Sequence, residues 1–305
     1  MATDIPISTE PGTEVVSKRS KPTSRAMLIW RRLRSTPRFW VGGILLAFFV
    51  LFALFGNTIN IYSPTDQDVF ALNEPPSAQH WFGTNTIGQD IYAQTVVGLQ
   101  KSLLIGIIAG PCASILAAII GSTAGYFGGR VEAIIVWFIN LLLVLPSFFI
   151  LVLMAPLLRQ LSWTAIVVFL VLFGWMIMAQ VVRNQTKAIK DRDFVRAARY
   201  MGVSTPKILS RHIIPNVASI LIVDATLGVV SAILAETSLS YFNLGIQKPD
   251  VSIGTLLADG SGAAATRPWL FVFPAGVLVL MLFAISLMAD ALRDAIDPTS
   301  GVNRD

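Results

Sequence analysis

Two carboxylates are candidates for chemistry because both lie within an otherwise apolar stretch of the sequence, at Asp224 and Glu236. An ionised side chain at the centre of a bilayer costs roughly 2.5–3.5 kcal/mol on insertion scales, so its presence calls for a partner or a function. We predict that one or both line a pathway through the protein and tolerate a cationic group such as an ammonium. The alternative is that they pair with backbone, water or a partner subunit, or reach an interface.

The rest of the sequence offers no enzyme chemistry. It contains no G-x-x-x-x-G-K-[ST] phosphate-binding loop, no serine nucleophile elbow and no paired carboxylates. The two histidines, His80 and His212, lie far apart in the sequence, and the single cysteine, Cys112, lies in an apolar run. We therefore expect no catalytic residue, no metal site and no cofactor in this chain.

The composition is typical of a membrane protein. The chain of 305 residues is 54% hydrophobic and only 13% charged, whereas soluble domains carry about 25% charged residues. Its net charge of +5 is too small and too segregated to indicate nucleic-acid binding. Two G-x-x-x-G spacings, Gly106 with Gly110 and Gly121 with Gly125, predict close helix packing.

Six apolar runs each approach the roughly 20 residues that a helix needs to cross the hydrocarbon layer. They are residues 39–56, 102–126, 131–157, 163–182, 217–245 and 269–290. Only helices and closed barrels satisfy their own backbone groups in lipid, and runs of this length are helical. The sequence therefore predicts an all-α membrane protein with six transmembrane helices.

The Lys and Arg residues are unevenly distributed along the chain. Residues 1–38 hold eight and residues 183–215 hold eight, whereas residues 57–100 hold none. The positive-inside rule then places both termini and the second basic segment in the cytoplasm, and residues 57–100 and 247–268 outside. The predicted divisions are a cytoplasmic tail with an interfacial segment at 1–38, a six-span domain at 39–290 and a cytoplasmic tail at 291–305.

The second basic segment, DFVRAARYMGVSTPKILSRHIIPN at 193–216, lies between two apolar runs. Apolar residues at helical spacing predict a first short helix, which Gly202 ends by adopting a left-handed conformation. Ser204 or Thr205 then caps a second helix, with Pro206 at its first position. The segment forms either a compact knob for another protein or a basic loop that merely fixes the topology.

This segment resembles the EAA loop of ABC importer permeases, in which E-A-A, three residues, Gly and nine further residues precede I-x-L-P. The chain has RAARYMG at 196–202 and HIIP at 212–215. The matching residues are Ala197, Ala198, Gly202 and Pro215. Arg196 replaces the Glu and His212 replaces the first Ile, and both changes are similar to the dipeptide/oligopeptide branch of the family.

The resemblance to that branch covers about residues 27–301. Further similar stretches are residues 80–106, 125–150, 232–260 and 290–301. Asn85 and Gln89 replace an Asp and an Arg that the branch has before the second span.

The resemblance implies a type I ABC importer permease fold, with a cytoplasmic coupling helix in the loop 185–215 that inserts into a groove on a separate ATPase subunit. The residues expected at this contact are Ala197, Ala198, Met201, Gly202 and Ser204, with Arg196 and Arg199 at the rim and Pro215 closing the motif. It also implies that the chain is not catalytic and that ATP and Mg bind to the partner ATPase subunits. A homologous permease, two ATPase domains and an extracytoplasmic binding protein are the expected partners, in a bacterial plasma (inner) membrane.

The resemblance favours di- and oligopeptides as cargo, with nickel, glutathione or another small cargo as alternatives. Two other classes of protein remain open. A stand-alone secondary transporter or channel would call for inverted repeats with broken helices, and no convincing internal repeat is present in the sequence. An inert scaffold of the membrane is the third possibility.

Overall fold

The structure is a computed structural model that describes residues 25–146, 149–150, 152–154 and 163–296. Within those residues all regular secondary structure is helical, as the sequence predicts. The helices are α1 (Arg25–Ser35), α2 (Pro37–Ile59), α3 (Ile91–Phe127), α4 (Gly129–Val144), α6 (Thr164–Gly174), α7 (Met176–Ile189), α8 (Asp193–Tyr200), α9 (Thr205–Ile208), the π-helix η1 (Leu209–Ile213), α10 (Ile214–Tyr241), α11 (Ile253–Ser261) and α12 (Trp269–Ile296). Residues 1–24 and 297–305 of the two predicted tails lie outside the described residues.

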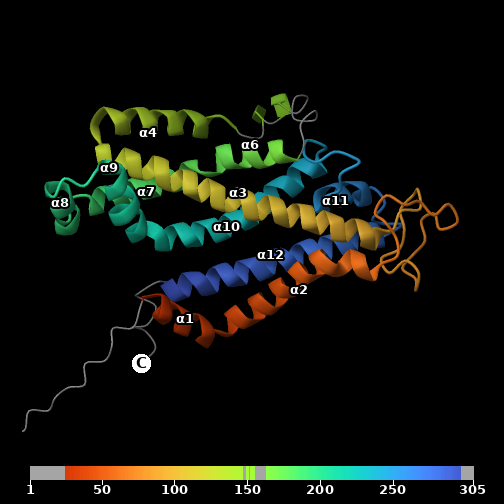
Figure 1. Cartoon of the computed structure of the whole chain (residues 1–305). Coiled ribbons are helices and arrows are strands. Elements are labelled where there is room, and N and C mark those ends of the chain that lie inside the picture. Colours follow the sequence, from red (N-terminus) through yellow and green to blue (C-terminus); the bar gives the residue numbers. More distant parts are fainter. Residues whose placement is uncertain (1–24, 147–148, 151, 155–162, 297–305) are drawn as a thin grey trace, which may run out of the picture.

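Helix α3 is the centre of the bundle and packs most extensively against α10 and α7 (Figure 1). Glycines permit both contacts. A Cβ built on Gly110 would lie 2.5 Å from the Val229 amide nitrogen of α10, and one built on Gly121 would lie 2.4 Å from the Ala179 carbonyl oxygen of α7. The two G-x-x-x-G spacings therefore mark the surfaces where α3 meets its two main neighbours.

Helices α2 and α12 lie side by side along another flank of the bundle (Figure 1). Their shared core with α3, α10 and α11 is apolar and buried, and includes Phe49, Leu99, Ile233 and Met281. Helix α1 joins this flank through Leu33, which packs against Ala291 and Ala295 of α12.

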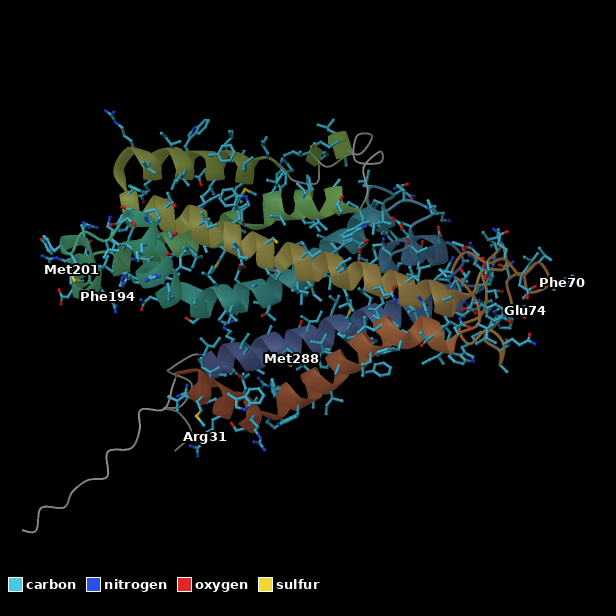
Figure 2. All side chains as sticks on the ribbon, viewed as in Figure 1. Arg31, Phe70, Glu74, Phe194, Met201 and Met288 are labelled. Carbon is cyan, nitrogen blue, oxygen red and sulfur yellow. The ribbon has the colours of Figure 1, made fainter. Side chains whose placement is uncertain are left out.

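The two ends of the bundle carry different segments (Figure 1). Helices α8 and α9 lie at one end, together with α1 and the C-terminal end of α12, whereas residues 60–90 and α11 lie at the opposite end. Figure 2 shows the same division in the side chains, with Phe194 and Met201 at one end and Phe70 and Glu74 at the other. The basic segments of the sequence thus share one end of the bundle, as the charge distribution predicts.

Four helical segments are long and apolar enough to cross a membrane: α2, α3, α12 and the continuous segment Thr205–Tyr241. Helices α6 and α7, bent by 40° at Trp175, form a fifth if they are counted as one span. The third predicted span, 131–157, begins with the 16-residue α4 and then runs into residues outside the described set. The count of six spans therefore stays a prediction.

Helix α3 is longer than the apolar run that predicts it. It has 37 residues and begins at Ile91, because the Asp90 side chain caps it by accepting a hydrogen bond from the Ala93 amide at 2.7 Å. At 1.5 Å per residue the helix is about 55 Å long, which exceeds the roughly 30 Å hydrocarbon layer. Residues 91–100, predicted to be part of the external segment 57–100, are therefore helical.

Candidate coupling surface and pathway groove

Helix α8 ends as the sequence predicts, at a glycine in the left-handed region. Gly202 has φ +75°, and the Val203 amide donates to the Ala198 carbonyl oxygen at 3.1 Å while the Gly202 amide donates to that of Arg199 at 3.0 Å. These two bonds form a Schellman motif, which satisfies the last carbonyls of the helix. The chain therefore turns sharply after only eight residues of helix.

The second helix of the segment, α9, does not end as a separate short helix. Ser204 is its N-cap residue and Pro206 lies in its first turn, without a side-chain capping bond. The π-helix η1 then joins α9 directly to α10, and Pro215 lies in the first turn of α10. A widened turn accommodates a proline, which has no amide hydrogen to donate. The predicted second short helix is thus the start of one continuous segment, Thr205–Tyr241.

The inner face of α8 is packed into the membrane domain. Val195 is 0% exposed and Ala198 is 1% exposed. Both belong to a core cluster that also contains Val182 of α7 and Val217 of α10. Helix α8 packs against α9 and η1, and its two buried residues extend the core cluster of α7 and α10 to the coupling segment.

The side chain of Ala198, one of the residues predicted to contact another protein, is buried in this conformation, and its contact with a partner stays a prediction. The other predicted contact residues are exposed: Arg196, Ala197, Arg199, Met201, Gly202, Ser204 and Pro215. Two aromatic residues that the sequence analysis did not include among the expected contacts are also exposed, Phe194 at 40% and Tyr200 at 83%. Together these nine residues, Phe194, Arg196, Ala197, Arg199, Tyr200, Met201, Gly202, Ser204 and Pro215, are called the coupling surface below.

Arg199 has a second role that its rim position did not indicate. Its guanidinium lies 5.3 Å from the centre of the Tyr126 ring at the end of α3, a distance suited to a cation–π interaction. Nearby, Glu132 of α4 accepts a hydrogen bond from Lys187 of α7 at 2.9 Å and lies 3.5 Å from the Arg183 guanidinium. The first contact joins α8 to α3, and the ion pairs of Glu132 join α4 to α7.

Asp224 lines a groove of about 430 Å³ between α3, α6 and α10. Its carboxylate accepts a hydrogen bond from the Ser114 hydroxyl of α3. The groove, called the Asp224 groove below, is otherwise lined by small, apolar and aromatic residues together with Ser231 and Ser238. The structure therefore places one of the two predicted pathway carboxylates beside open space.

Glu236 has a different environment and does not line this groove. Its side chain is 0% exposed, and it accepts hydrogen bonds from the hydroxyls of Ser102 at 3.1 Å and Ser240 at 2.7 Å. The carboxylate thus joins α10 to α3 in the interior. The serines that surround it were not singled out in the sequence, although hydroxyl residues within apolar runs are a signal for such partners.

Comparison with known protein families shows which family the chain belongs to. Residues 117–301 match the model of the family described as binding-protein-dependent transport system inner membrane component. Residues 24–76 match the N-terminal TM domain of oligopeptide transport permease C. The chain belongs to this family of permeases.

Curated relatives are similar over most of the permease. The oligopeptide transport system permease protein OppC of Mycobacterium tuberculosis is 50% identical over 78% of this chain and 82% of its own. OppC of Bacillus subtilis is 33% identical over 95% and 96% of the two chains. The dipeptide transport system permease protein DppC of the same organism is 35% identical over 96% and 91%.

A solved structure supports the fold of the permease. A chain of the MetNI methionine ABC transporter in inward facing conformations aligns with a TM-score of 0.54 at 16% identity. The alignment covers 67% of the permease and 96% of that chain. The type I ABC importer permease fold predicted from the sequence is thereby confirmed.

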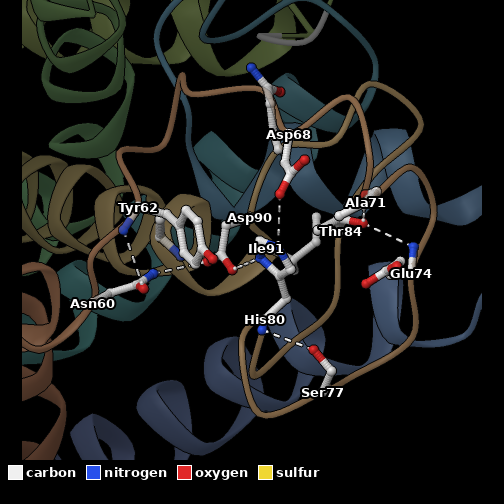
Figure 3. Close-up of polar contacts among 12 residues, drawn as sticks. Asn60, Tyr62, Asp68, Ala71, Glu74, Ser77, His80, Thr84, Asp90 and Ile91 are labelled. Carbon is white, nitrogen blue, oxygen red and sulfur yellow. Dashed lines mark hydrogen bonds and ion pairs between the residues drawn. The ribbon is translucent and has the colours of Figure 1, made fainter.

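Residues 60–90, which the charge distribution predicts to be external, contain a buried histidine with two carboxylate partners (Figure 3). His80 is 1% exposed, and its Nδ1 lies 2.9 Å from Asp90 Oδ2, with Nε2 3.9 Å from Asp68. The same Asp90 caps α3 and accepts a hydrogen bond from Asn60 at the end of α2. One carboxylate thus links the segment to two membrane helices.

Asn85 and Gln89, which the resemblance marked as departures from the branch, are hydrogen-bonded to each other. The Asn85 amide nitrogen donates to the Gln89 side-chain oxygen at 2.9 Å, and the Gln94 amide donates to the same oxygen at 2.8 Å. A neutral amide network therefore occupies the positions where the branch has an Asp and an Arg.

Proposed function

We propose that this chain is the membrane permease subunit of an ATP-driven importer that moves dipeptides and oligopeptides delivered by an extracytoplasmic binding protein. The observation that supports it most is α8, whose inner face is packed into the membrane domain while its outer face carries exposed apolar side chains. A loop that only fixed the topology would need its basic residues but not this buried anchor. The names of the curated relatives supply the peptide cargo.

The complete importer in this proposal contains a homologous permease subunit, two ATPase domains and an extracytoplasmic binding protein. It works in a bacterial plasma (inner) membrane, with both termini of this chain in the cytoplasm. The chain itself is not catalytic, and ATP and Mg bind to the ATPase domains. The shared end of α1, α8 and the last turns of α12 supports placing these segments on one side of the bilayer (Figure 1).

The coupling surface is the proposed contact with the ATPase. Movement of a docked ATPase would displace α8, and the core that Val195 and Ala198 share with α7 and α10 would pass that displacement to both helices. Packed cores transmit such shifts because they rearrange as units. Helix α10 also carries Asp224, so a displacement passed to α10 would reach one wall of the Asp224 groove.

Asp224 is proposed to line the translocation pathway. For Glu236 the burial and the two serine hydrogen bonds favour a different role, an internal tie between α3 and α10. The pathway proposal therefore rests on Asp224 alone.

Reconstitution in proteoliposomes tests this function. The complex of both permeases, the ATPase subunits and the binding protein is expected to import peptides only when ATP is present. Met201→Asp, which places a charge on the exposed apolar tip, is expected to lower the ATPase stimulation caused by loaded binding protein, whereas Met201→Leu retains it. Uptake by this chain alone would instead support a secondary carrier, and ATP-dependent import of nickel or glutathione in place of peptides would reassign the cargo.

A further inference from the structure

The polar residues of the Asp224 groove lie at a regular spacing on α10. Asp224, Ser231 and Ser238 are separated by seven residues each, and all three line the groove. Seven residues are nearly two helical turns, so the three side chains share one face at intervals of about 10.5 Å. The groove is thus an elongated site, and among the described residues that line it the single ionisable one, Asp224, lies at one end of this row.

The Asp224 carboxylate lacks a counter-ion among the described residues. Its Oδ2 accepts the Ser114 hydroxyl, and the described residues offer no hydrogen bond to its Oδ1. No Lys, Arg or His is among the described residues that line the groove. A carboxylate in low-dielectric surroundings is strongly stabilised by a cation that reaches it. The carboxylate therefore has an open side that a positively charged group in the groove can reach.

The walls of the groove indicate what carries that charge. Phe169 and Phe173 of α6 provide aromatic surface for apolar side chains, and aromatic faces also attract ammonium groups. Ser231 and Ser238 lie along the groove. The Ser238 hydroxyl donates to the Leu234 carbonyl oxygen at 2.8 Å, so its oxygen is left to accept a hydrogen bond from an N–H group of an extended molecule. A volume of about 430 Å³ lies within the usual range of ligand sites. These features fit an elongated cargo with an ammonium group near one end better than a bare metal ion, which would need several oxygen ligands.

We propose that Asp224 is a specificity-determining residue that binds a primary ammonium group of the cargo during translocation, while the rest of the cargo lies along α10 towards Ser238. This inference rests on the proposed function, because it assigns the peptide-binding chemistry of the same importer. The ammonium comes from the free N-terminus of the peptide or from a lysine side chain. An alternative occupant is a helix of the partner permease.

The test uses the complete importer in proteoliposomes and an equimolar mixture of three kinds of tripeptide, followed by mass spectrometry of the imported material. The first kind has a free N-terminus and no lysine, the second is N-acetylated without lysine, and the third is N-acetylated with one lysine. Wild type, Asp224→Asn and Asp224→Glu are compared with the same binding protein, so that its own preferences cancel in the ratios. Asp259→Asn is the matched control, since Asp259 is a carboxylate of α11 outside the groove that pairs with the exposed Lys248.

Asp224→Asn is expected to lower the import of tripeptides that carry an ammonium group, relative to the N-acetylated tripeptide without lysine, by at least about tenfold. This factor corresponds to about 1.4 kcal/mol. Asp224→Glu and Asp259→Asn are expected to keep the wild-type ratio. Loss of preference for the first kind alone identifies the N-terminus, and loss for the third kind identifies the lysine side chain.

An unchanged ratio in Asp224→Asn overturns the proposal, and so does an equal or complete loss of all three kinds, which is the result expected if a helix of the partner permease occupies the groove. Leu227→Lys gives a second measurement, because Leu227 lies three residues from Asp224 on the same lining and a lysine there would occupy the carboxylate. It is expected to abolish the preference, and a retained preference contradicts the assignment. If wild type imports no tripeptide with ATP, the proposed function fails instead.

Discussion

Ala197 and Ala198 are neighbours in the sequence, but they lie on opposite sides of the boundary between the permease core and its coupling surface. Ala198 is 1% exposed, whereas Ala197 is exposed. The same substitution, alanine to leucine, therefore separates the anchoring of α8 from its contact with a partner. If both residues only contacted the ATPase, the two variants would behave alike.

The size of the effect follows from the packing. Ala198→Leu forces three further carbon atoms into the cluster formed with Val195, Val182 and Val217, and overpacking of this kind costs about 1–3 kcal/mol. A local opening free energy lowered by that amount raises the population of the open state by about 5- to 140-fold. Ala197→Leu adds the same atoms in solvent, where alanine and leucine differ little in helix propensity.

Hydrogen exchange of residues 193–204 in the permease pair without ATPases measures this difference. Ala198→Leu is expected to accelerate exchange by the factor above, and Ala197→Leu is expected to leave it unchanged. With the ATPases present, both variants are expected to lower coupled ATP hydrolysis, through a displaced helix in one and a blocked contact in the other. Unchanged exchange in Ala198→Leu, or equal acceleration in both variants, would refute the assignment of Ala198 as an anchor.

Three further substitutions test the end of α8, the contact between α3 and α10, and the packing of residues 60–90. Gly202→Ala is expected to destabilise the end of α8 by about 1–2 kcal/mol, because φ +75° is unfavourable for a residue with a Cβ; Gly262→Ala, at a φ of −67° with open space around it, serves as the control, and equal effects on thermal unfolding would contradict the argument. Gly110→Ala is expected to lower the melting temperature by separating α3 from α10, whereas nothing lies within 4 Å of a Cβ at Gly276, so Gly276→Ala should be neutral. His80→Ala removes a buried partner of the carboxylate that caps α3, so we expect a loss of about 1.5–3 kcal/mol and faster proteolysis of residues 60–90; unchanged proteolysis would show that the histidine does not hold the segment.

The sequence by itself determined the class of fold and the turn of the coupling segment, because these depend on local chemistry. Apolar runs of membrane-crossing length can satisfy their backbone only as helices. Gly202 adopts the left-handed conformation with little cost wherever a helix must stop. The distribution of Lys and Arg likewise predicted which segments share one end of the bundle, since it depends on counts along the chain.

Only the tertiary structure decided which side chains of those segments are buried. Val195 and Ala198 are buried in a cluster that also contains residues of α7 and α10, while Phe194 and Met201 of the same segment are exposed. The sequence also did not distinguish the two carboxylates of α10. Asp224 accepts a hydrogen bond from Ser114 and lines an open groove, whereas Glu236 accepts one from Ser102 and is fully buried. A helical period gives the faces of a helix, but the neighbours that cover each face come from other parts of the chain, and their positions depend on how the whole bundle packs.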